Sequence, residues 1–309
     1  AGFDWGTSMF KAEDHPDTYL VDRACEYLRR QHDRPFLLVV SVNSPHSPYF
    51  PPKPYDTMFD PRQIKLPPNT GVYSSVRRPI VHRGHPKSLK SIHQATDDDL
   101  RKRWAAYLGM AAHIDDLMGK VQSTLERGGI RDNTVVLYSA DHGDSMGSHR
   151  VPDKGDYMFD PVARIPFLLS WPGHIRPQVI APPASQVDML PTLLGLCGIA
   201  DPVRRHGRSF AKPLTGTIAP GNSPVFSEYN QFYGENFPVR AIITEKFKYV
   251  HYFGPEGELF DRKGDPNELT NLAAAPDHAD TVKSMQALLF QQMRTTNDPT
   301  IRLKSQNWL

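Results

Sequence analysis

Cysteine, long apolar runs and strong net charge are all scarce in this sequence of 309 residues. With two cysteines, the chain has no disulfide framework of the kind that stabilises small secreted domains. No apolar stretch approaches the roughly 20 residues that a helix needs to span a bilayer. The formal charge of +2 and the lack of a Lys/Arg run give no basis for nucleic-acid binding. The sequence therefore predicts neither a membrane span nor a nucleic-acid partner.

Proline, by contrast, is abundant, and alternating helix and strand patterns fill the rest of the chain. The 29 prolines indicate long shaped loops, as at 45–54. The expected elements before residue 200 are helices at 17–31, 97–127 and 187–197, and strands at 36–42, 134–140 and 165–171. Short strands follow from about residue 224, and a helix is expected over 277–295. This order favours an α/β core with a mostly parallel sheet over 1–220, and an α+β subdomain with an antiparallel sheet over 221–309.

The segment Asp141-His142-Gly143 directly follows the apolar strand pattern TVVLYSA. α/β proteins place their sites outside the carboxyl ends of strands, so an Asp-His pair there is well placed to ligate a metal. Gly143 lets the backbone turn sharply and approach a ligand. Lys154 then offers a cation to an anionic substrate. The alternative is a strand-end capping aspartate and an ordinary loop histidine.

These motifs and several others resemble the sulfatase family, within the alkaline-phosphatase-like superfamily. The resemblance rests on Asp-His-Gly, on Gly147-x-His149, on Lys154 and on Arg164-Ile165-Pro166. Other matching segments are Pro45-His46-Ser47-Pro48 after the 36–42 pattern, Val187-Asp188-Met189-Leu190-Pro191-Thr192, and 239–273, which resembles the closing β-meander of the family. The resemblance thus covers nearly the whole chain and implies an alkaline-phosphatase-like sandwich.

The resemblance also implies roles for single residues. Asp141 and His142 would ligate the metal, and Lys154 would contact the sulfate group and stabilise or protonate the leaving oxygen. His46 would bind sulfate or protonate the leaving alcohol; a loop-anchoring histidine is the alternative. His149 would contact substrate or support the metal loop. Arg164 would hold that loop through a bidentate carboxylate pair.

One divalent metal is expected, and its identity depends on the Asp-His pair. The commoner pair in the family is Asp-Asn, whose amide oxygen suits Ca²⁺. Imidazole suits softer metals such as Mn²⁺ or Zn²⁺. Because the family contains both forms, calcium is the first expectation, and manganese and zinc are the alternatives.

Two family motifs do not occur in the sequence. One is an Asp-Asp pair that completes the metal site, and the other is a Cys-x-Pro-Ser-Arg-like motif whose Cys or Ser becomes a formylglycine nucleophile. Cys25 precedes Glu-Tyr-Leu and Cys197 precedes Gly-Ile-Ala, so neither fits. We therefore expect the nucleophile and half of the metal site in a segment N-terminal to Ala1, which would be a partner of this chain.

The sequence as a whole predicts a sulfuric ester hydrolase acting on a sulfated carbohydrate or aryl sulfate. The alternatives are a phosphodiesterase or phosphonate monoester hydrolase of the same superfamily, and a catalytically incomplete fragment or pseudoenzyme. A homo-oligomer and a periplasmic or secreted location are compatible with the family. The basic stretch 74–90 is a candidate lid, and the aromatic stretch 228–238 is a candidate pocket rim.

Overall fold

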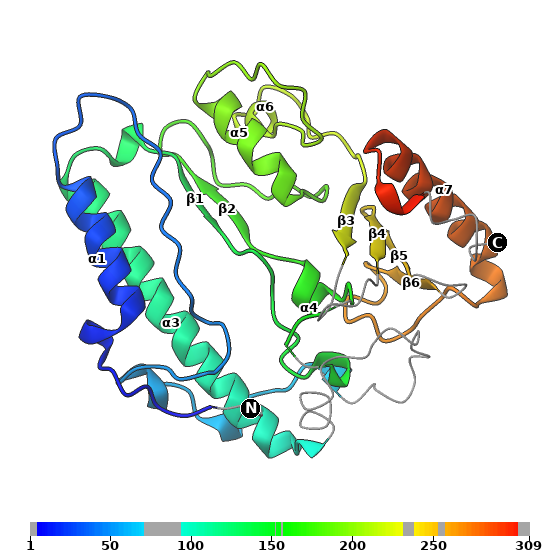
Figure 1. Cartoon of the computed structure of the whole chain (residues 1–309), viewed down its shortest axis with the longest axis horizontal. Coiled ribbons are helices and arrows are strands. Elements are labelled where there is room, and N and C mark those ends of the chain that lie inside the picture. Colours follow the sequence, from blue (N-terminus) through cyan, green and yellow to red (C-terminus); the bar gives the residue numbers. More distant parts are fainter. Residues whose placement is uncertain are drawn as a thin grey trace.

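The computed structural model of the chain describes residues 5–70, 94–151, 153–155, 157–230, 238–252 and 257–301. Two long helices lie side by side along one flank, and a two-stranded sheet lies in the middle (Figure 1). A four-stranded sheet with a helix against it lies at the other flank. This arrangement confirms the α/β class with an antiparallel C-terminal sheet. In the described ranges, every helix is too short or too polar to cross a membrane.

The first flank consists of α1 (Pro16–Leu28) and α3 (Asp97–Arg127), close to their predicted bounds. The His15 side chain caps α1 by accepting a hydrogen bond from a backbone N–H of the first turn. A capping box formed by Thr96 and Asp99 begins α3. The two helices pack through a cluster that contains the buried side chains of Val21, Cys25, Ile114 and Leu117.

The middle sheet consists of β1 (Val136–Ser139) and β2 (Phe167–Ser170), which pair antiparallel with Leu137 opposite Leu169. Parallel pairing in the described part of this half is limited to isolated bridges, such as the one between Trp5 and Tyr49. The predicted mostly parallel sheet is therefore represented here by two antiparallel strands.

The prediction of a strand over 36–42 is wrong. The segment forms no ladder with any other described segment. Leu37 and Val39 are 80% and 76% exposed, so apolar side chains that suit a buried strand face solvent. A strand exists only where a neighbouring segment pairs with its N–H and C=O groups, and the described residues provide none at this position.

Three shorter helices follow β1 in the chain: α4 (Asp160–Ala163) lies between β1 and β2, and α5 (Met189–Leu196) and α6 (Ala211–Leu214) connect the two sheets. A capping box between Ser185 and Asp188 begins the turn that leads into α5. The predicted helix at 187–197 is thereby confirmed.

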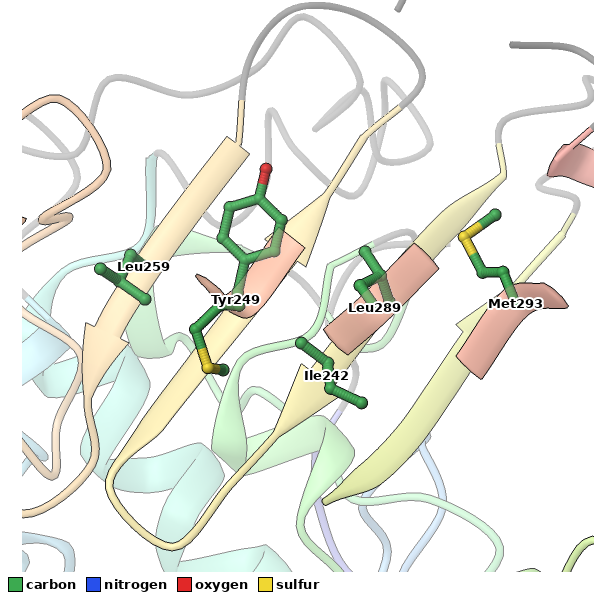
Figure 2. Packing of buried hydrophobic residues seen from close by; sticks show 6 residues of the cluster. Ile242, Tyr249, Leu259, Leu289 and Met293 are labelled. Atoms are coloured by element: carbon green, nitrogen blue, oxygen red, sulfur yellow. The ribbon is translucent and has the colours of Figure 1, made fainter. Parts of the chain in front are cut away.

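The C-terminal sheet is an antiparallel meander in the order β3-β4-β5-β6. Its strands are Val225–Tyr229, Val239–Ile243, Phe247–His251 and Gly257–Asp261, and α7 (Ala279–Thr295) covers one face. Ile242, Tyr249 and Leu259 of the sheet meet Leu289 and Met293 of α7 in one buried cluster (Figure 2). Each fully buried side chain of this size contributes roughly 1.5–3 kcal/mol, so this face stabilises the meander substantially.

Two buried ion pairs fasten this sheet to its surroundings. Arg240 of β4 donates to both carboxylate oxygens of Asp298, at 2.5 and 3.0 Å. Lys248 of β5 donates to Asp160 of α4 at 2.6 Å and also pairs with Glu268. Lys248 thus joins the part of the chain after residue 220 to Asp160, which lies before it. The division into domains 1–220 and 221–309 stays a prediction.

Candidate active site

Asp141 and His142 lie in the loop that follows β1, as the sequence predicts. His142 Nε2 is 3.5 Å from Asp141 Oδ2. His142 Nδ1 is 2.8 Å from the Gly143 carbonyl oxygen, which only accepts, so Nδ1 carries a proton and Nε2 is the ring nitrogen left to bind a metal. A backbone carbonyl at one ring nitrogen is the usual partner of a histidine that binds metal through the other. The Asp141 side chain is 88% exposed and thus open to a ligand.

These two donors fit part of a metal site. Among the described residues, no group of three or more His, Cys, Asp or Glu side chains is arranged to hold a metal ion. A carboxylate and an imidazole supply two ligands, whereas calcium takes six to eight and zinc usually four. Asp141 and His142 therefore require ligands from elsewhere.

Gly143 is required by the packing of this loop against α4. A Cβ at this position would lie 2.0 Å from the Pro161 carbonyl oxygen. The Gly143 N–H donates to the Val162 carbonyl oxygen at 2.8 Å. On the other side, Gln186 donates to the carbonyl oxygen of Asp141 at 2.8 Å. These contacts hold the Asp-His pair in place from two sides.

His46 and Lys154 approach each other from loops that are 108 residues apart in sequence. Lys154 Nζ lies 2.5 Å from His46 Nε2, and His46 Nδ1 lies 2.6 Å from the Ser47 carbonyl oxygen. Because that carbonyl only accepts, Nδ1 carries a proton and Nε2 accepts a hydrogen bond from Lys154. The His46 and His142 rings are 6.4 Å apart. The structure thus brings His46, Lys154 and the Asp-His pair to one place.

His149 lies apart from this group. It has no solvent exposure, stacks on Phe159 at 3.9 Å, and its Nε2 is 3.2 Å from Asn69 Nδ2. Of the two roles considered for His149, burial favours support of the loop, and substrate contact stays a prediction.

Arg164 forms no bidentate carboxylate pair with the residues that the structure describes. Its Nη1 is 3.9 Å from Asp160 Oδ2, and its side chain is 74% exposed. Lys248, distant in sequence, takes the Asp160 carboxylate at 2.6 Å, and the pairing of Arg164 with a carboxylate of the metal site stays a prediction. The candidate lid 74–90 and most of the candidate rim 228–238 lie outside the described residues.

Sequence reasoning missed a buried polar cluster beneath these loops, made of Arg103, Tyr49, Asp144 and Asp153. Arg103 Nη2 donates to Asp153 Oδ1 at 3.0 Å, and the Tyr49 hydroxyl donates to Asp144 Oδ2 at 2.6 Å. Burial raises the pKa of Tyr49, with Asp144 adding to the effect. Burial also raises the pKa of Asp153, against the lowering effect of Arg103. The available signal was an arginine on the apolar face of the 97–127 helix.

A second missed residue is Asp17, in the first turn of α1. Its carboxylate is 2% exposed and accepts hydrogen bonds from Asn43 N at 3.0 Å and from Ser44 N at 3.3 Å. It also accepts the Ser44 hydroxyl at 2.5 Å. Asp17 thus anchors the backbone just before Pro45-His46.

Comparison with known proteins identifies relatives over nearly the whole chain. The family model described as "Sulfatase" matches residues 4–199, and the one described as "N-sulphoglucosamine sulphohydrolase, C-terminal" matches 147–295. "Uncharacterized sulfatase YidJ" of Escherichia coli K12 is 31% identical over 94% of this chain. An arylsulfatase of Clostridium perfringens is 29% identical over 94% of it. The chain spans 57% and 59% of the lengths of these two relatives.

Solved structures show the same fold. A proposed sulfatase from Bacteroides thetaiotaomicron matches with a TM-score of 0.79 and 26% identity, over 97% of this chain and 69% of that one. A phosphonate monoester hydrolase from Silicibacter pomeroyi matches with a TM-score of 0.82 and 24% identity, over 94% of this chain and 62% of that one. The second likeness concerns the fold alone.

Proposed function

The chain belongs to the sulfatase family, and from this premise we propose that it carries the larger part of the active site of a sulfuric ester hydrolase. The observation that supports this most is the convergence of His46 and Lys154 next to the Asp141-His142 pair. Lys154 Nζ is 2.5 Å from His46 Nε2, and the His46 ring is 6.4 Å from that of His142. The Lys154 ammonium and the imidazoles of His46 and His142 lie together near the end of β1, and such a group of side chains is suited to binding a tetrahedral anion such as sulfate.

The pair of His46 and Lys154 would act on the leaving group. Hydrolysis breaks the bond between sulfur and the ester oxygen, and that oxygen leaves with the bond electrons. It needs a proton to depart as an alcohol, while water supplies the oxygen that ends on sulfate. The transferable proton of this pair is on the Lys154 ammonium, which would give it to the leaving oxygen directly or pass it on through His46 Nε2, the acceptor of the Lys154 hydrogen bond.

Asp141 and His142 would hold one divalent metal, with calcium as the first candidate and manganese or zinc as alternatives. The donor set fits this role because the His142 Nε2 lone pair and the Asp141 carboxylate face the same region. When bound, the metal neutralises the sulfate oxygens and makes sulfur more electrophilic.

We propose that the nucleophile, a formylglycine, and the remaining metal ligands come from a segment N-terminal to Ala1. Exposed apolar side chains support a partner at the middle sheet. Leu37 and Val39 are 80% and 76% exposed, Leu168 of β2 is 62% exposed, and Tyr138 of β1 is 38% exposed. Apolar side chains gathered on a sheet and beside it are suited to burial against a further segment of protein.

The substrate class that we propose is a sulfated carbohydrate or an aryl sulfate. The C. perfringens relative, named an arylsulfatase, supports the second of these. A phosphonate monoester or phosphodiester is the alternative, favoured by the fold shared with the S. pomeroyi hydrolase. A catalytically incomplete chain is the third possibility.

The test is a comparison of substrates with the complete protein, meaning the product of the whole gene with any residues encoded before Ala1. Phenyl sulfate and a phenylphosphonate monoester are assayed side by side, and the metal content is measured. We expect faster hydrolysis of the sulfate and one metal per chain. Faster hydrolysis of the phosphonate with two zinc ions would support the alternative. Hydrolysis of neither ester, nor of a sulfated monosaccharide assayed beside them, would support the incomplete chain.

A further inference from the structure

The buried cluster of Arg103, Tyr49, Asp144 and Asp153, here called the Arg103 cluster, takes one member from each loop of the candidate site. Tyr49 follows His46 by three residues, Asp144 follows His142 by two, and Asp153 directly precedes Lys154. Arg103 itself comes from α3, whose long helix runs beside these loops (Figure 1). The cluster is therefore the place where the three loops and the helix meet.

The contacts of the Arg103 cluster join these loops directly. Arg103 Nη2 lies 3.0 Å from Asp153 Oδ1 and 3.4 Å from the Tyr49 hydroxyl, and its guanidinium lies 5.0 Å from the centre of the Tyr49 ring. The Tyr49 hydroxyl in turn donates a hydrogen bond to Asp144 Oδ2 at 2.6 Å. The backbone adds one further link, because Ser145 N donates to the Asp153 carbonyl oxygen at 2.7 Å.

Burial makes this arrangement rigid. Arg103 is 1% exposed and Tyr49 is fully buried. A buried guanidinium is costly unless it is paired, and its planar fork accepts few geometries. A shift of either loop would leave the buried Arg103 guanidinium without its partner Asp153, whose side chain is 30% exposed, so the cluster resists such shifts.

We propose that Arg103 is a positioning residue that sets the spacing between His46 and Lys154. This inference rests on the proposed function, because the spacing matters only where the two side chains act on one leaving group. A misplacement of about 1 Å costs on the order of 100-fold in rate, and Arg103 controls both loops at once. Arg103 would then affect the rate of ester hydrolysis as well as the stability of the fold.

The test uses Arg103→Met, Tyr49→Phe and the control Lys102→Met in the complete protein. Lys102 lies next to Arg103 on α3 but is partly exposed and pairs with Asp98. Each protein is assayed with phenyl sulfate, whose leaving group needs a proton, and with 4-nitrophenyl sulfate, whose leaving group does not. Tyr49→Phe keeps the ring and removes one hydroxyl, so it is the variant to use where Arg103→Met fails to fold.

We expect Arg103→Met to lose on the order of 100-fold in kcat on phenyl sulfate and no more than about 10-fold on 4-nitrophenyl sulfate. Tyr49→Phe should show the same selectivity with a smaller loss, and Lys102→Met should match the wild type. Equal losses on both esters would show a role in folding alone and overturn the proposal. Unchanged rates would overturn it as well. A wild-type protein that hydrolyses neither of these esters nor a sulfated monosaccharide would overturn the proposed function and this role with it.

Discussion

Replacing Gly143 with alanine tests how the Asp-His loop is held. The added Cβ would lie 2.0 Å from the Pro161 carbonyl oxygen, whereas real Cβ contacts essentially never fall under 3.0 Å. The loop and α4 must therefore move apart by about 1 Å (3.0 minus 2.0). The Cβ position is fixed by the backbone, and the atoms that it meets belong to the backbone of Pro161 and Val162, so no side-chain rotation relieves the clash.

The expected cost follows from two contributions. Overpacking of this kind costs roughly 1–3 kcal/mol. The hydrogen bond from Gly143 N to the Val162 carbonyl oxygen, now 2.8 Å, would be stretched or lost, which adds about 0.5–1.5 kcal/mol. We expect Gly143→Ala to lower the free energy of unfolding by about 2–4 kcal/mol. It should also weaken metal binding, since Asp141 and His142 move with the loop.

The assay is urea denaturation of wild type and variant, compared at equal m-value. Gly119→Ala is the matched control, because a Cβ at Gly119 of α3 meets nothing within 4 Å. That variant should gain about 0.5–1 kcal/mol, as alanine does over glycine inside a helix. A Gly143→Ala protein as stable as the wild type would refute the packing argument.

Three further predictions concern charge and catalysis. Lys154→Ala in the complete protein should reduce turnover of an aryl sulfate by on the order of 10²–10³, and an unchanged rate would refute its role. Asp141→Ala should abolish metal retention, measured as metal per chain after dialysis, because the dication loses its carboxylate. Burial favours a raised pKa for Asp298, but hydrogen bonds from Arg240 and Thr300 lower it overall. The ion pair of Arg240 and Asp298 should therefore stabilise the folded state above about pH 4. This contribution should be lost as the pH falls through the lowered pKa of Asp298. The stability advantage of wild type over Asp298→Asn, measured by urea midpoints, should shrink in acid; an advantage independent of pH would contradict this.

The parts of the fold that could be predicted are those whose stability is local or strongly periodic. The 97–127 helix was predicted at its observed bounds because its apolar stripe is visible in the sequence. The C-terminal strands and α7 were predictable for the same reason. The strand at 36–42 was not, because a strand depends on a partner that the pattern does not contain.

The candidate site divides in the same way. His46, Asp141, His142 and Lys154 stand in motifs, and the structure brings them together as the resemblance implied. Arg103 and Asp17 act through contacts 50 and 26 residues away in sequence, which no local pattern reveals. The position of Arg103 on the apolar face of a helix indicates a buried charge, but it does not identify Asp153 as the partner.

The measurement that tests the central claim most directly is a crystal structure of the complete protein with sulfate and the physiological metal bound. We predict a sulfate oxygen within about 3 Å of Lys154 Nζ, the normal range of such a hydrogen bond, with the His46 ring beside it. The metal should be ligated by Asp141 and His142. A sulfate bound away from Lys154 and His46, or a metal held without Asp141, would contradict the account.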